Sequence, residues 1–176
     1  MARIRERVFA GFGAFLFLAS ACGLTIFVIM QPNSNNTSST TSSQHTCSNS
    51  QTGPTLDVPE AYKPTEPVTA LQATDLTAGS GVAAKDGDCL VMKYYGTLAS
   101  NGTKFDEDFT DTTAFGFTLG QGQVIQGWDK GLVGMKVGGT RRLLIPAAQA
   151  YGDQAQGSIP ANSDLVFVVK LLRIQK

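Results

Sequence analysis

Apolar and polar positions divide the chain into three stretches of different character. Residues 8–30 form an uncharged, mostly apolar run of 23 residues. Residues 31–55 are polar, and twenty of these 25 are Ser, Thr, Asn or Gln. Beyond them, short apolar segments alternate with turn-forming residues up to the C-terminus. This division predicts an N-terminal membrane anchor or signal segment over 1–30, a linker over 31–67 and one folded domain over 68–176.

The apolar run is long enough to cross a bilayer. A helix of this length measures about 35 Å, against a hydrocarbon core of about 30 Å. Three arginines precede the run and no charged residue follows it before Asp57. Positive charge stays on the cytoplasmic side, so we expect a single-pass membrane protein whose domain is extracytoplasmic. A secreted or lipid-anchored protein is the alternative, because Ala19-Ser20-Ala21 resembles a signal-peptidase site and Cys22 follows it.

The polar stretch predicts a disordered linker. Its residues cannot bury enough apolar surface to offset the entropy lost on ordering, and the four prolines between 54 and 67 stiffen its end. His45 and Cys47 are expected to be ordinary linker residues, with a metal-binding pair as the alternative. The three cysteines do not make a Cys-rich framework, so we expect Cys89 to be a packed or partly exposed thiol.

Within the domain, the spacing of apolar residues predicts an α+β fold. Strands are expected over 68–76, 89–98, 115–119, 140–145 and 164–174. One helix is expected over 124–135, where Ile125, Trp128, Leu132 and Met135 recur at helical spacing. The predicted fold is a curled antiparallel β-sheet packed on one short α-helix, preceded by a transmembrane helix and a disordered linker.

Composition removes several classes of function. Fourteen Lys and Arg balance fourteen Asp and Glu, so we expect no nucleic-acid partner. The single histidine, His45, lies in the predicted linker. The domain therefore cannot hold a Ser-His-Asp triad, a Cys-His pair or a His-based zinc site, and we expect no metal or cofactor.

Eight sequence blocks resemble those of the FKBP-type peptidyl-prolyl cis–trans isomerases, the rapamycin-binding class. They follow one another in the family's order and close to its spacing over most of the domain. The blocks are Tyr94–Leu98, Gly102–Asp106, Phe115–Gly120, Val124–Trp128, Gly131–Gly138, Ala150–Gly152, Ile159–Pro160 and Leu165–Phe167.

The resemblance implies a pocket for proline between the sheet and the helix. It assigns catalytic roles to Asp106, Tyr151 and Phe167. It assigns substrate binding to Tyr94, Phe105, Phe115, Val124, Ile125, Trp128 and Ile159.

Individual roles follow from the same resemblance. Trp128 forms the pocket floor, while the Ile125 N–H and the Tyr151 hydroxyl bind substrate carbonyls. Asp106 orients the reacting segment and is held by Tyr94, and residues 152–158 form a flap. The family often has a basic residue where this chain has Asp111, so its usual ion pair with Asp106 is in doubt.

This function agrees with the chemistry that composition leaves open. Rotation about an X–Pro bond breaks no bond and moves no proton, so it needs no histidine, nucleophile or metal. We therefore predict a peptidyl-prolyl isomerase that assists the folding of extracytoplasmic proteins. Its expected partners are proline-containing polypeptides, rapamycin-like macrolides and the membrane. The alternative is a proline-binding scaffold or receptor module that does not require catalysis.

Overall fold

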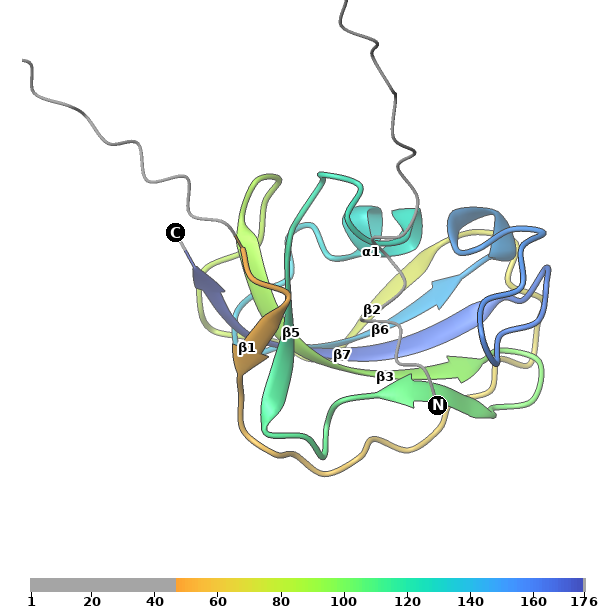
Figure 1. The fold of residues 1–176 in the computed structure, drawn as a ribbon, viewed down its shortest axis with the longest axis horizontal. Helices are drawn as coiled ribbons and strands as arrows, with labels where there is room; N and C mark the ends of the chain where they lie inside the picture. The colour runs from red at the N-terminus through yellow and green to blue at the C-terminus, as the bar shows by residue number, and fades with distance from the viewer. Residues whose placement is uncertain (1–46, 176) are drawn as a thin grey trace, which may run out of the picture.

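A computed structural model describes residues 47–175 (Figure 1). They form seven strands, one short α-helix and one 3₁₀ turn. The elements are β1 (Ser50–Thr52), β2 (Gln72–Thr77), β3 (Cys89–Leu98), β4 (Lys104–Glu107), β5 (Thr113–Thr118), α1 (Gln126–Gly131), β6 (Thr140–Ile145), the 3₁₀ turn η2 (Ala147–Gln149) and β7 (Leu165–Gln175).

The strands make one antiparallel sheet that curls beneath α1 (Figure 1). Their order across the sheet is β1-β5-β3-β7-β6-β2, and β4 pairs with β3 beside this path. The expected curled sheet on one short helix is confirmed for the described residues.

Strands β3 and β7 form the centre of the sheet. They pair from Cys89↔Gln175 to Leu98↔Leu165. Because side chains alternate along a strand, one face of β3 carries Leu90, Met92 and Tyr94, and all of these lie in the main core cluster with α1 residues. The expected bounds of β3 agree with the structure, as do those of β6.

The helix is shorter than expected. It covers only Gln126–Gly131 rather than 124–135, although Trp128, Leu132 and Met135 are buried as the spacing predicted. Gly134 turns the chain with a φ of +76° and donates its N–H to Ala84. Pairing with the 82–84 segment therefore replaces the last helical turns.

Two other elements differ from the prediction. The strand expected over 68–76 is observed as β2, Gln72–Thr77, and all of its residues are exposed. Val68 lies outside β2 and is buried on the sheet face that points away from α1. Strand β4 was not predicted, because its four residues are too few to show alternation.

The expectation of a disordered linker is wrong for residues 47–56. These residues, which we call the arm, are fixed to the sheet. A disulfide joins Cys47 to Cys89, with a Cα–Cα distance of 5.4 Å, so Cys89 is not a free thiol and Cys47 is not an ordinary linker residue. The Leu56 N–H donates to the Phe109 carbonyl oxygen at 2.7 Å.

Strand β1 of the arm pairs with β5 at one edge of the sheet (Figure 1). Ser50 lies opposite Phe115, and Thr52 opposite Thr113. Gly116 permits this contact, because a Cβ there would overlap the carbonyl oxygen of Ser48. Arg173 of β7 donates to the Thr52 carbonyl oxygen at 3.0 Å.

The following segment covers the sheet face opposite α1. Tyr62 packs against a second core cluster, and the Arg142 guanidinium lies 3.6 Å from the centre of its ring. This cluster contains Val68, Ala99, Leu144 and Val166. The N-terminal part of the described chain therefore contributes to the core, although the predicted domain boundary at residue 68 stays a prediction.

Between residues 47 and 175, no helix is long and apolar enough to span a membrane. The predicted span over 8–30 lies outside the described residues, so the transmembrane helix stays a prediction.

Candidate functional site

The main core cluster contains a group of aromatic rings centred on Trp128. Its indole contacts Phe167 at a centroid distance of 5.1 Å and Tyr94 at 5.6 Å. Phe117 and Phe115 follow at 5.8 and 5.9 Å. These five rings come from α1 and from three neighbouring strands, so residues distant in sequence are brought together as the resemblance implied.

Partly buried residues pack against these rings. Ile159 is buried in the same cluster, while Phe105, Val124, Ile125 and Tyr151 pack against it and remain partly exposed. All the expected site residues except Asp106 thus belong to this cluster or pack on it. The partial exposure means that the aromatic group approaches the surface here, as a binding site for an apolar ring requires. The individual roles of these residues stay predictions.

Asp106 joins the group through Tyr94. The Tyr94 hydroxyl donates to Asp106 Oδ2 at 2.8 Å, and the Glu107 N–H donates to Oδ1 at 2.9 Å. The expected contact between Tyr94 and Asp106 is therefore confirmed. Asp106 reaches this position because β4 pairs with β3, which sets Asp106 opposite Gly96.

The Tyr151 hydroxyl is held in its protonated form. Burial, followed by the negative charge of Asp106, raises the pKa of Tyr151 to about 12. A phenol with this pKa remains a hydrogen-bond donor at any physiological pH. The site thus presents one donor near one carboxylate.

The helix fixes the backbone that precedes it. Asp129 accepts hydrogen bonds from the N–H groups of Gly120 and Gly122 at 2.9 and 3.0 Å, which ties the loop after β5 to α1. This loop leads into Ile125, whose backbone is extended. Among the described residues the Ile125 N–H makes no backbone hydrogen bond, so it can donate to a ligand.

The segment expected to form a flap is closed at its base. The Asn162 N–H donates to the Gly152 carbonyl oxygen at 2.7 Å, and Gln156 and Ile159 exchange two backbone hydrogen bonds at 2.9 Å. These bonds connect the flap to Tyr151 at one end and to the core through Ile159 at the other.

Lys93 was not recognised from the sequence as part of this region. Its side chain is completely buried, and Nζ donates to the carbonyl oxygens of Asp108, Asp111 and Thr113 at 2.6–2.7 Å. Asp108 and Asp111 lie on the connection between β4 and β5, which separates Asp106 from Phe115, and Thr113 is the first residue of β5. Lys93 lies on the β3 face away from Tyr94, where Gly53 of the arm packs beside its side chain, and no sequence pattern indicated this cover.

Two further features of the aromatic group were not anticipated. Phe117 contacts Trp128 and stacks on Phe115, and its position two residues along the same strand could have indicated this. Trp128 Nε1 is buried and has no hydrogen-bond partner within residues 47–175. A buried donor without a partner is costly, and a bound carbonyl would remove that cost.

No group of three or more His, Cys, Asp or Glu side chains in the described part of the chain is placed to hold a metal ion. The acidic side chains near Asp106 bond to protein groups instead. Asp108 Oδ1, for example, accepts the Tyr94 N–H at 2.7 Å.

Comparison with known proteins defines the class to which this fold and aromatic group belong. The profile of the FKBP-type peptidyl-prolyl cis-trans isomerase family matches residues 81–172. The chain is 50% identical over 127 residues to FK506-binding protein 4 of Neurospora crassa, covering 70% of this chain and 27% of that protein. It is 52% identical over 101 residues to a peptidyl-prolyl cis-trans isomerase of Saccharomyces cerevisiae, covering 57% and 24%.

A solved structure agrees with this class. The crystal structure of AtFKBP13 superposes with a TM-score of 0.55 at 33% identity, covering 60% of this chain and 93% of that one. The chain spans about a quarter of the length of the two curated relatives. It belongs to the FKBP-type peptidyl-prolyl cis-trans isomerase family.

Proposed function

We propose that this protein is a peptidyl-prolyl cis–trans isomerase that accelerates X–Pro rotation in extracytoplasmic polypeptides. The observation that carries the proposal is the placement of Tyr151 and Asp106 at the partly exposed side of the aromatic group around Trp128. A saturated proline ring fits an aromatic surface, and the polar groups beside it can hold the imide that rotates.

Binding follows from the chemistry of the side chains. The proline ring packs on the Trp128 indole, with Tyr94, Phe115, Val124 and Phe167 around it. The Ile125 N–H and the Tyr151 hydroxyl donate to substrate carbonyl oxygens. The unpartnered Nε1 of Trp128 is a further donor in this group. Asp106 orients the reacting segment and is itself fixed by Tyr94.

Catalysis then requires the removal of water rather than proton transfer. Amide resonance gives the X–Pro bond a barrier of about 18–20 kcal/mol. Resonance separates charge, so an apolar site that strips water from the imide carbonyl weakens the double-bond character and lowers this barrier. An acceleration of about 10³–10⁵ requires about 4–7 kcal/mol, which desolvation together with one or two hydrogen bonds can supply.

The disulfide supports the extracytoplasmic part of the proposal. Disulfides form and persist in oxidising compartments and are rare in the cytosol. The Cys47–Cys89 bond therefore fits the orientation expected from the N-terminal arginines. In this arrangement a membrane span over residues 8–30 leads into the arm, and the isomerase domain lies outside the cytoplasm.

Labelling of thiols in intact cells tests this location. Cys47 and Cys89 should resist alkylation until a reductant is added, and externally added protease should release the domain by cleavage before Cys47. Free thiols at both positions, or protection from protease, would contradict the location and leave the catalytic proposal unaffected.

Macrolide binding is part of the same proposal. Relatives of this chain are named FK506-binding proteins, and the aromatic group provides an apolar surface on which a macrolide could pack. We therefore expect the site to bind rapamycin-like macrolides in competition with proline-containing peptides.

Exchange spectroscopy of a short Ala-Pro peptide tests the activity. Sub-stoichiometric amounts of the full chain should produce cis–trans exchange cross-peaks on a time scale of seconds or faster, against tens to hundreds of seconds unaided. Binding of the peptide without enhanced exchange would instead favour a proline-binding module and overturn the catalytic proposal.

A further inference from the structure

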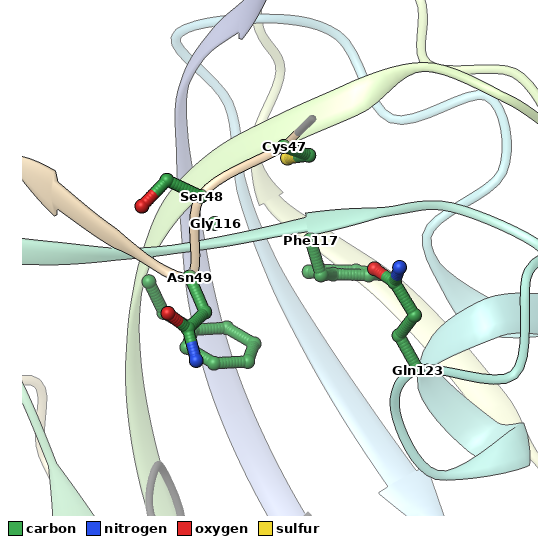
Figure 2. A pocket seen from close by; sticks show the side chains of 7 residues that line it. Cys47, Ser48, Asn49, Gly116, Phe117 and Gln123 are labelled. Atoms are coloured by element: carbon green, nitrogen blue, oxygen red, sulfur yellow. The ribbon is translucent and has the colours of Figure 1, made fainter. Parts of the chain in front are cut away.

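A cavity lies beside the aromatic group, where the arm meets β5. Its volume is about 250 Å³, and it is partly open to solvent. Figure 2 shows the side chains that line it. Cys47, Ser48 and Asn49 of the arm form one side. Phe115, Gly116 and Phe117 of β5, together with Gln123, form the other.

This cavity adjoins the proposed proline site, because two rings belong to both. Phe115 and Phe117 line the cavity and also contact Trp128 at centroid distances of 5.9 and 5.8 Å. We expect a polypeptide with its proline ring on Trp128 to place a neighbouring residue at the cavity, because successive residues are about 3.8 Å apart and the shared rings lie directly beside the indole.

The lining of the cavity defines what it can accept. None of the seven lining residues is charged. The phenyl rings provide apolar surface, and Asn49 and Gln123 provide amide groups on opposite sides (Figure 2). Gln123 Oε1 accepts the Thr118 N–H at 2.9 Å, which fixes this side chain. An uncharged side chain on an extended peptide matches this combination.

The arm is held firmly enough to act as a wall. The disulfide fixes Cys47, and the Gly116 N–H donates to the Asn49 carbonyl oxygen at 3.4 Å. Strand pairing begins at the next residue, Ser50. Asn49 is thus held between the disulfide at Cys47 and the paired strand that begins at Ser50. Binding of a ligand therefore loses little conformational entropy in the arm.

We propose that the arm completes a substrate subsite, in which Asn49 contacts the residue next to proline and selects for an uncharged side chain. This inference rests on the proposed function, because its ligand is the same proline-containing polypeptide. It adds a specificity determinant, Asn49, from a part of the chain that the matched family segment, residues 81–172, does not include.

An isosteric change of charge tests the subsite. Asn49→Asp keeps the shape of the side chain and places a negative charge in the cavity. Thr52→Asp is the matched control, because it adds the same charge to an exposed position of the same arm. The peptides carry Lys or Glu at the residue directly before proline or at the residue directly after it. They are compared at about 0.15 M salt, where charges beyond about 8 Å are screened.

The full chain and both variants are assayed for peptide binding by fluorescence anisotropy and for kcat/KM by peptide exchange. At one flanking position, Asn49→Asp should raise the preference for Lys over Glu about two- to fivefold, as expected for one solvent-accessible ion pair. Thr52→Asp should leave this ratio unchanged. Intact disulfides and similar melting temperatures establish that both variants retain the docked arm.

The outcomes separate the two proposals. If Asn49→Asp changes the ratio no more than Thr52→Asp at every position, the subsite is wrong and the isomerase proposal stands. If the peptides bind and Asn49→Asp shifts the ratio of dissociation constants without turnover, the subsite stands and the isomerase proposal fails. If no peptide binds, both are wrong.

Discussion

A disulfide joins Cys47 to Cys89, 42 residues apart, and thereby attaches the arm to the first residue of β3. Cys89 also lies opposite Thr118 at the end of β5, so the bond closes the corner where β1, β3 and β5 meet. The disulfide, together with the pairing of β1 and β5, makes the arm part of the sheet, although its composition is that of a linker.

Breaking this bond should lower the stability of the domain. A cross-link of this loop length contributes about 2–4 kcal/mol to the free energy of unfolding, mainly by restricting the unfolded chain. We expect that loss for Cys47→Ser in urea titrations followed by Trp128 fluorescence. Cys89→Ser and the double variant should match it, because all three lack the same bond. Costs that add in the double variant would show that the cysteines act separately.

Replacement of Lys93 by methionine should be strongly destabilising. Nζ donates to three carbonyl oxygens, two in the β4–β5 connection and one at the start of β5, and an unsatisfied buried polar group costs about 1–3 kcal/mol. We predict a loss of about 3 kcal/mol or more in the free energy of unfolding. Lys170→Met is the control, since within residues 47–175 its Nζ makes one hydrogen bond, a solvent-exposed one to the Gly138 carbonyl oxygen. Equal losses in both variants would contradict this account of Lys93.

The activity should be almost independent of pH from about 6 to 8, because carboxylates and tyrosines do not normally titrate there. The domain contains no histidine, and the pKa of Tyr151 is raised to about 12. A raised folded-state pKa contributes stability that is complete below the unfolded value of about 10 and is lost as pH rises toward 12. A kcat/KM profile and an alkaline unfolding series, each compared with Tyr151→Phe, test these statements. An inflection near pH 7 would show that another titrating group controls the rate.

Ligand binding should change the fluorescence of Trp128, the only tryptophan of the chain. A macrolide placed on its indole alters the emission saturably and raises the melting temperature by mass action. Tyr151→Phe should weaken binding by about 0.5–1.5 kcal/mol, the contribution of one hydrogen bond. Phe167→Ala should weaken it more and also lower stability by about 3–5 kcal/mol, because this buried ring packs directly on Trp128. Emission that does not change while another method detects binding would place the ligand elsewhere.

The sequence predicted those parts of the fold in which local pattern and tertiary packing agree. Strand β3 is one example, since its alternation sets Leu90, Met92 and Tyr94 on one face, and the structure packs that face into the main core cluster. The helix shows the opposite case. Apolar spacing extended it to residue 135, but Gly134 and its hydrogen bond to Ala84 end it earlier. Spacing alone does not reveal such a competing partner.

The arm could not be predicted from its own residues. Polar residues of the 47–56 segment bury little surface, and a disulfide and a partner strand supply the contacts that order them. The signals were present elsewhere, in a cysteine at the start of β3 and in Gly116, which leaves room for Ser48. The family resemblance indicated the aromatic residues of the candidate site, whereas the cavity beside Asn49 depends on the docked arm and was not expected.

The refolding of a protein limited by proline isomerisation tests the central claim most directly. Catalytic amounts of the full chain should increase the slow refolding rate in proportion to their concentration, and rapamycin should abolish the effect. Asp106→Leu should retain the melting transition but lose about tenfold or more of the activity, equivalent to about 1.4 kcal/mol of transition-state stabilisation. A slow phase unchanged by the wild-type chain, or accelerated equally by Asp106→Leu, would contradict the account.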